Sequence, residues 1–304
     1  MYICINFKKL LLAVSCSALA VIILSVTIAA NLSRPAAVLP DAADKVQLPI
    51  IMYHSILNNA ARSGNYVITP KMLEEDFKYV KEHGFTPITV NELIGYVYED
   101  KKLPEKPIMI TFDDGFMNNY SCAFPLLKEY GFKAVISCIG KLTVTESIKS
   151  DYNDNYSYMT WTQMKEMHES GLVEFQNHSY DLHDTKKGRN GALKKRRESA
   201  EDYEIFLIND INTSQTLMKA HLGITPSAYV YPFGAFSAQS EEIIKKAGFK
   251  STLICTAVIN YIGRDPECLY KLGRFNRPAG ISTERFFSKI LAKYIEPTVK
   301  DRKE

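Results

Sequence analysis

The sequence has almost no excess charge, no close pair of cysteines and no basic segment interleaved with aromatic residues. Its 37 lysines and arginines against 34 aspartates and glutamates give a net charge of +3, which argues against nucleic acid as a partner. The one basic run, Lys194 to Arg197, is followed at once by acidic residues and is typical of a solvated helix start.

The cysteines are also far apart. Without a C-x-x-C pair, a thiolate metal site is not expected. Four of the six cysteines follow residue 31, and they allow one or two disulfides in an oxidising compartment: Cys122, Cys138, Cys255 and Cys268. The sequence does not choose among the pairings, and buried free thiols are the alternative.

What is present begins with an apolar N-terminal segment. Lys8 and Lys9 precede an uncharged stretch, residues 10–30, that is long enough to cross a bilayer core of about 30 Å. We therefore expect residues 1–30 to be a cytoplasmic stub and transmembrane anchor, with cleavage as a signal segment near Thr27 and Ala29 as the alternative. The positive-inside rule places the rest of the chain outside the cell, membrane-tethered or, after cleavage, secreted.

The remaining chain has the pattern of one α/β domain. Residues 31–45 are rich in Ala, Pro and Asp and suit a linker, residues 46–296 are the expected folded domain, and residues 297–304 are a polar tail. Helix-like stretches alternate with strand-like ones at residues 48–54, 107–112, 133–139, 173–176, 227–231, 251–255 and 270–275. This alternation predicts a deformed (β/α) barrel of about seven parallel strands, with its chemistry at the carboxyl ends of the strands.

Polar residues do follow several of these strands. The strand over residues 107–112 runs into Asp113, Asp114 and Gly115, where the end of the strand lets two neighbouring carboxylates reach one site. The strand over residues 173–176 runs into a loop with His178 and His183. Two imidazoles and a carboxylate from another strand end supply the three ligands and open position of a catalytic zinc site.

Two further strands end in candidate groups. The first strand ends at His54, and the strand over residues 227–231 ends in Tyr231, Pro232, Phe233 and Gly234, a turn with exposed backbone N–H groups. Alone, each is an ordinary structural feature, but a single site at the strand ends accounts for all four segments.

At this point the sequence resembles the polysaccharide deacetylase family, carbohydrate esterase family four. Residues 111–115, Thr-Phe-Asp-Asp-Gly, match one family motif, and residues 178–183, His-Ser-Tyr-Asp-Leu-His, match its metal motif. The resemblance implies that Asp113 is the catalytic base and that Asp114, His178 and His183 bind a divalent metal, most readily Zn²⁺, with Co²⁺ or Ni²⁺ as alternatives.

The departures from the family pattern are informative. Residues 230–234, Val-Tyr-Pro-Phe-Gly, lack the Arg and Tyr of the family's R-x-P-Y-G motif, so the Arg that usually orients the base is missing. No His follows His221, but residues 48–54 are similar to the P-I-x-M-Y-H opening of extracellular poly-N-acetylglucosamine deacetylases. In that subgroup an early His is the general acid, which implies this role for His54.

The function implied is metal-dependent removal of N-acetyl groups from an N-acetylglucosamine-containing extracellular or cell-wall polysaccharide, which makes the protein a hydrolase of non-peptide carbon–nitrogen bonds. The turn at residues 231–234 would bind substrate and the tetrahedral oxyanion, chiefly through the N–H of Phe233. Two alternatives stay open: a barrel glycosidase that pairs Asp113 with another carboxylate, and a catalytically weak module that binds cell-wall glycan.

Overall fold

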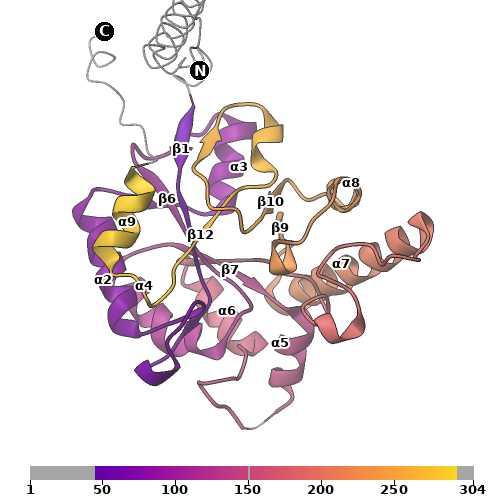
Figure 1. Ribbon diagram of the computed structural model, residues 1–304, viewed down its shortest axis with the longest axis horizontal. Helices are drawn as coiled ribbons and strands as arrows, with labels where there is room; N and C mark the ends of the chain where they lie inside the picture. Colours follow the sequence, from indigo (N-terminus) through magenta and orange to yellow (C-terminus); the bar gives the residue numbers. More distant parts are fainter. Residues whose placement is uncertain (1–44, 150, 293–304) are drawn as a thin grey trace, which may run out of the picture. The chain divides into compact units, whose positions relative to one another are not determined.

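A computed structural model of the chain describes residues 45–149 and 151–292 (Figure 1). The expected membrane segment and polar tail, with all but the last residue of the linker, lie outside the described residues. Within the described ranges, no helix combines the length and apolar character needed to cross a bilayer.

The main sheet has eight strands, and all of its pairings are parallel. Its order is β10-β9-β8-β7-β6-β2-β12, and β5 pairs with β6 beside this path. The strands are β2 (Ile50–Tyr53), β5 (Thr86–Pro87), β6 (Pro107–Phe112), β7 (Ala134–Cys138), β8 (Val173–Asn177), β9 (Ala228–Val230), β10 (Ser251–Leu253) and β12 (Phe275–Asn276). This confirms the predicted parallel α/β fold.

One short segment joins the two edges of this sheet. Leu272 pairs in parallel with Leu253 of β10, and β12, only three residues later, pairs in parallel with β2. Residues 272–276 therefore nearly close the sheet into a barrel. The sequence predicted a single strand over residues 270–275, but the structure divides the pairing of this segment between two neighbours.

The remaining described strands form two small two-stranded sheets. One pairs β1 (Val46–Leu48) antiparallel with β11 (Asn260–Ile262), and the other pairs β3 (Ser55–Ile56) in parallel with β4 (Val67–Ile68).

The helices surround the strands (Figure 1). They are α2 (Pro70–Glu82), α3 (Val90–Glu99), α4 (Phe124–Tyr130), α5 (Gly140–Ser147), α6 (Trp161–Glu169), α7 (Ala200–Leu222), α8 (Ala238–Lys246) and α9 (Thr283–Leu291). Helix α7 begins later than predicted because the Ser199 side chain caps it by accepting the N–H of Asp202. The exposed basic run 194–197 thus precedes the helix and does not start it.

The inward-facing side chains change from apolar to polar along the barrel. Met109 of β6 packs in a buried cluster with residues of neighbouring strands, such as Ile50 and Val135. Because side chains alternate along a strand, Thr111 and then Asp113 follow Met109 on the same face. The apolar interior therefore supports a polar layer at the carboxyl ends of the strands. In the described part all four cysteines are free.

Candidate active site

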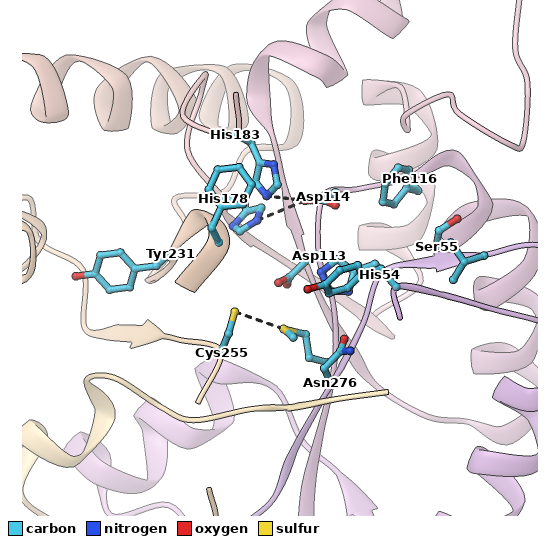
Figure 2. A pocket seen from close by; sticks show the side chains of 14 residues that line it. His54, Ser55, Asp113, Asp114, Phe116, His178, His183, Tyr231, Cys255 and Asn276 are labelled. Atoms are coloured by element: carbon cyan, nitrogen blue, oxygen red, sulfur yellow. Dashed lines mark hydrogen bonds and ion pairs between the residues drawn. The ribbon is translucent and has the colours of Figure 1, made fainter. Parts of the chain in front are cut away.

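The predicted residues meet in one cavity of about 500 Å³ at the carboxyl ends of the strands (Figure 2). Its lining includes Asp113 and Asp114 after β6 and both histidines of the loop after β8. His54 after β2 and Phe233 after β9 line it as well. Four strand ends that are far apart in the sequence thus converge, as the barrel rule predicts.

The backbone of the turn after β6 lets two consecutive residues, Asp113 and Asp114, both line the cavity. Asp114 and Gly115 both adopt left-handed backbone conformations, with φ of 69° and 76°. A side chain on Gly115 is excluded, because its Cβ would lie 2.7 Å from Sγ of Cys138. A non-glycine residue in this conformation is strained, and such strain is typical of functional sites.

Asp114, His178 and His183 form the candidate metal centre. Oδ1 of Asp114 lies 3.5 Å from Nε2 of His178 and 3.4 Å from Nε2 of His183. These separations are long for hydrogen bonds, and this buried oxygen accepts none from the described residues. Two ligands of a tetrahedral zinc ion lie about 3.3 Å apart, so the three atoms fit around a shared ion.

A backbone contact orients the His178 ring towards Asp114. Its Nδ1 lies 2.7 Å from the carbonyl oxygen of Val230, which leaves Nε2 directed at Asp114. Burial disfavours the charged ring, but the neighbouring carboxylates of Asp114 and Asp113 outweigh it and raise the pKa of His178. His183 is less buried, and burial together with His178 lowers its pKa. A metal ion would compete with protons most strongly at His178.

Asp113 is held by an arginine that the sequence analysis missed. Nη1 of Arg274 donates to Oδ1 of Asp113 at 2.7 Å, and Nη2 donates to Oδ2 at 2.8 Å. The hydroxyl of Ser137 also donates to Oδ1, at 2.7 Å. Burial opposes ionisation, but the Arg274 guanidinium holds the pKa of Asp113 well below its usual value.

This ion pair corrects the expectation that the base lacks an orienting arginine. The motif position, Val230, indeed has no guanidinium, but Arg274 reaches Asp113 from the segment that closes the barrel. The signal in the sequence was weak: Arg274 lies within the strand expected over residues 270–275, and Arg277 follows just after it. Both are fully buried, and each pairs with an aspartate.

His54 faces the carboxylates from the other side of the cavity (Figure 2). Its ring contacts Tyr66 edge-on, with 4.8 Å between ring centroids, and its Nδ1 has no partner among the described residues. Burial lowers the pKa of His54, although the charges of Asp113 and Asp114 act in the opposite direction. The neutral ring is therefore favoured more than in a free imidazole.

The turn at residues 231–234 presents one candidate donor. Pro232 has no N–H, and the N–H of Gly234 donates to the carbonyl of Tyr231 at 2.9 Å. This leaves the N–H of Phe233, a residue with a left-handed φ of 58°. The Phe233 ring lies 4.1 Å from that of His183 and is partly exposed to the cavity.

Tyr231 does not present its side chain to the site. Its ring is fully buried and points away from the carboxylates in Figure 2, and its hydroxyl donates to Glu241 at 2.8 Å. Tyr231 lines the cavity without directing its hydroxyl into it. Instead, the cavity has aromatic rings that the sequence analysis did not assign to it, those of Tyr66 and Phe116.

Comparison with known proteins agrees with this geometry. The family profile described as "Polysaccharide deacetylase" matches residues 100–252. A Bacillus subtilis protein named as a polysaccharide deacetylase, YxkH, is 31% identical over 241 residues, which are 79% of this chain and 75% of that protein. The chain belongs to the polysaccharide deacetylase family. It is therefore a hydrolase of non-peptide carbon–nitrogen bonds, as the sequence analysis predicted.

Other relatives of this polysaccharide deacetylase carry more specific names. A Staphylococcus aureus poly-beta-1,6-N-acetyl-D-glucosamine N-deacetylase is 28% identical over 186 residues, 61% of this chain and 60% of that protein. The solved structure of IcaB from Ammonifex degensii is 26% identical, with a TM-score of 0.62 over 76% of this chain and 92% of that one. A de-N-acetylase from Aggregatibacter actinomycetemcomitans shares the fold, with 24% identity and a TM-score of 0.68 over 80% and 99%.

Proposed function

We propose that this polysaccharide deacetylase removes N-acetyl groups from an extracellular polymer of N-acetylglucosamine in a metal-dependent reaction that releases acetate. One observation carries the proposal. A buried carboxylate oxygen of Asp114, which accepts no hydrogen bond from the residues that the structure describes, faces two imidazole nitrogens, and an ionised carboxylate, Asp113, lies next to it in the same cavity.

Asp114, His178 and His183 would hold the metal, for which Zn²⁺ is the best candidate and Co²⁺ or Ni²⁺ are alternatives. When bound, the ion supplies Lewis-acid chemistry and lowers the pKa of a coordinated water from 15.7 towards about 7. Asp114, His178 and His183 would supply three protein ligands, the number typical of a catalytic site rather than of a closed structural one.

Asp113 takes the proton of the attacking water. Its Oδ1 already accepts two hydrogen bonds, from Ser137 and Arg274, whereas Oδ2 accepts one, from Arg274. Oδ2 thus has a lone pair available to the cavity. Because its pKa is low, Asp113 is ionised at neutral pH, which is the form that can accept a proton.

His54 donates the proton that the departing amine needs, because an unprotonated amine is a poor leaving group. Its position across the cavity from the metal ligands suits donation to the leaving nitrogen. The N–H of Phe233, in the turn that lines the cavity, would stabilise the negative charge on the tetrahedral oxygen.

The alternatives have less support. The described residues that line the cavity include two carboxylates, Asp113 and Asp114, and these are neighbours in the chain. One faces Arg274 and the other faces the two histidines, so neither has the separate partner that a glycosidase requires. A pure binding module would not explain a strained turn that aligns these groups.

The cavity also suits a sugar. The rings of Tyr66, Phe116 and Phe233 line it, and aromatic rings offer flat apolar faces to pyranoses. The names of the staphylococcal relatives favour poly-β-1,6-N-acetylglucosamine over peptidoglycan or chitin oligomers. The apolar segment at residues 10–30 supports attachment to the cell membrane with the catalytic domain outside, or secretion if it is cleaved.

An acetate-release assay on these three glycans tests the proposal. We expect the largest rate on the β-1,6-linked polymer, loss of activity with a chelator, and recovery on addition of zinc. Equal acetate release from all three glycans would remove the substrate assignment. No acetate from any of them, with metal supplied, would favour the binding module.

A further inference from the structure

The metal loop, residues 178–183, donates backbone hydrogen bonds to a carboxylate on helix α7. Asp210 accepts the N–H of Tyr180 at Oδ1 and the N–H of Asp181 at Oδ2, both at 2.8 Å. These are the two central residues between the ligands His178 and His183. One side chain, about 30 positions away in the sequence, thus binds the middle of the loop with both oxygens.

The other N–H groups between the two histidines have local partners. Ser179 donates to Oδ1 of Asn177 at 2.8 Å, and Leu182 donates to Oγ of Ser179 at 3.1 Å. Such short-range bonds shape the loop but do not attach it to the rest of the fold. Of these four amides, the two that donate to Asp210 connect the loop to an element distant in the sequence, helix α7.

The carbonyl side of the loop is attached to helix α5. The N–H of Gly140 donates to the carbonyl of Ser179, and that of Lys141 donates to the carbonyl of Tyr180, both at 3.0 Å. Ser179 itself has a left-handed φ of 70°, a strained conformation for a residue with a side chain. The loop therefore needs neighbours on both sides to keep this shape.

Burying the carboxyl group of Asp210 costs folding free energy that a neutral residue would avoid. It is 8% exposed, and it forms no ion pair with the described residues. Burial raises its pKa to about 6, although the two backbone N–H groups act in the opposite direction. An asparagine or serine would avoid this cost but has only one oxygen, and only a carboxylate accepts from both amides with two oxygens.

We propose that Asp210 is a positioning residue that presets His178 and His183 at the separation required by the metal. This inference rests on the proposed metal site. A bend at residues 180–181 sets where His183 lies relative to His178, whose own ring is fixed by Val230. Groups that orient metal ligands in this way typically contribute about 10- to 100-fold to metal affinity or activity.

The test is zinc binding by the full-length chain, freed of metal by a chelator and then titrated with zinc against a chromophoric competitor. We expect Asp210→Ala to weaken zinc binding by about 10- to 100-fold. Ser214→Ala is the matched control, because Ser214 lies one turn further along α7, is fully buried, and has a hydroxyl without a partner among the described residues. Its zinc affinity should equal that of the wild type.

The stability of the metal-free protein separates positioning from folding. If Asp210→Ala lowers the melting temperature but leaves zinc affinity at the wild-type value, Asp210 only stabilises the fold and the inference is wrong. If this variant does not fold, Asp210→Asn replaces it: the amide keeps the shape and one acceptor, and we expect a smaller but measurable loss of affinity. Unchanged affinity in a folded Asp210→Asn protein would then also overturn the inference.

The result also distinguishes this inference from the proposed function. If the wild-type chain does not bind zinc, cobalt or nickel, the proposed metal site is wrong and the role of Asp210 with it. If the wild type binds zinc and the Asp210 variants bind it equally well, the metal site stands and only the positioning role is lost.

Discussion

Arg274 and Asp113 form a buried bidentate ion pair, although they lie 161 positions apart in the chain. Arg274 lies between the residue that pairs with β10 and the strand that pairs with β2, so the segment closing the barrel also brings the guanidinium to the base. The segment that closes the barrel therefore also supplies the counter-charge of the base.

Replacement of Arg274 should affect stability and activity together. In Arg274→Met the buried carboxylate of Asp113 loses its counter-charge, which typically costs about 3 to 5 kcal/mol of unfolding free energy. Arg274→Lys keeps the charge but not the planar fork, so we expect a smaller loss of stability with a clear loss of kcat. Denaturant unfolding and steady-state kinetics measure both effects. An Arg274→Met protein as stable and active as the wild type would show that the pair has neither role.

Asp113→Asn should abolish turnover and retain the metal. The amide cannot take a proton from water, whereas the ligands Asp114, His178 and His183 are unchanged. Metal content by mass spectrometry and acetate release by the same sample provide the measurement, with circular dichroism as the control for folding. Loss of metal from a folded Asp113→Asn protein would contradict this division of roles.

His54→Gln should lower kcat by about 10²- to 10⁴-fold, the usual contribution of a general acid, without loss of metal. A general acid must be protonated, so wild-type activity should fall as the pH rises through the pKa of His54. Burial places that pKa below the usual 6.5 of imidazole. The pH profile of kcat/KM should therefore show this decline in the wild type and lack it in His54→Gln. An identical decline in both proteins would assign the acid to another group.

Local patterns predicted most of the fold. The strand β6 was predicted with its exact bounds because an apolar run is enclosed by Pro107 and the polar turn that begins at Asp113. Helix α5 was missed because it begins at a glycine and contains Thr143, Val144 and Thr145, β-branched residues with low helix propensity. Packing against its neighbours, not propensity, makes this segment helical.

The site was predicted where strand ends carry its groups and missed where tertiary structure supplies them. Asp114, His178 and His183 follow strands, so the barrel rule predicts from the sequence that they lie close together. Arg274 and Asp210 reach the site from a closing segment and a helix, and no spacing in the sequence connects them to their partners. Tyr231 lines the cavity, as its place in the motif suggested, but its ring packs against Tyr229 and Phe236, a contact that no sequence pattern indicates.

The most direct test of the whole account follows three products in one reaction on poly-β-1,6-N-acetylglucosamine: acetate, free amine and new reducing ends. The account predicts one acetate for each free amine and no new reducing ends, with all turnover lost after metal removal and restored by zinc. New reducing ends without acetate, formed equally well in the presence of a chelator, would contradict it and identify a glycosidase.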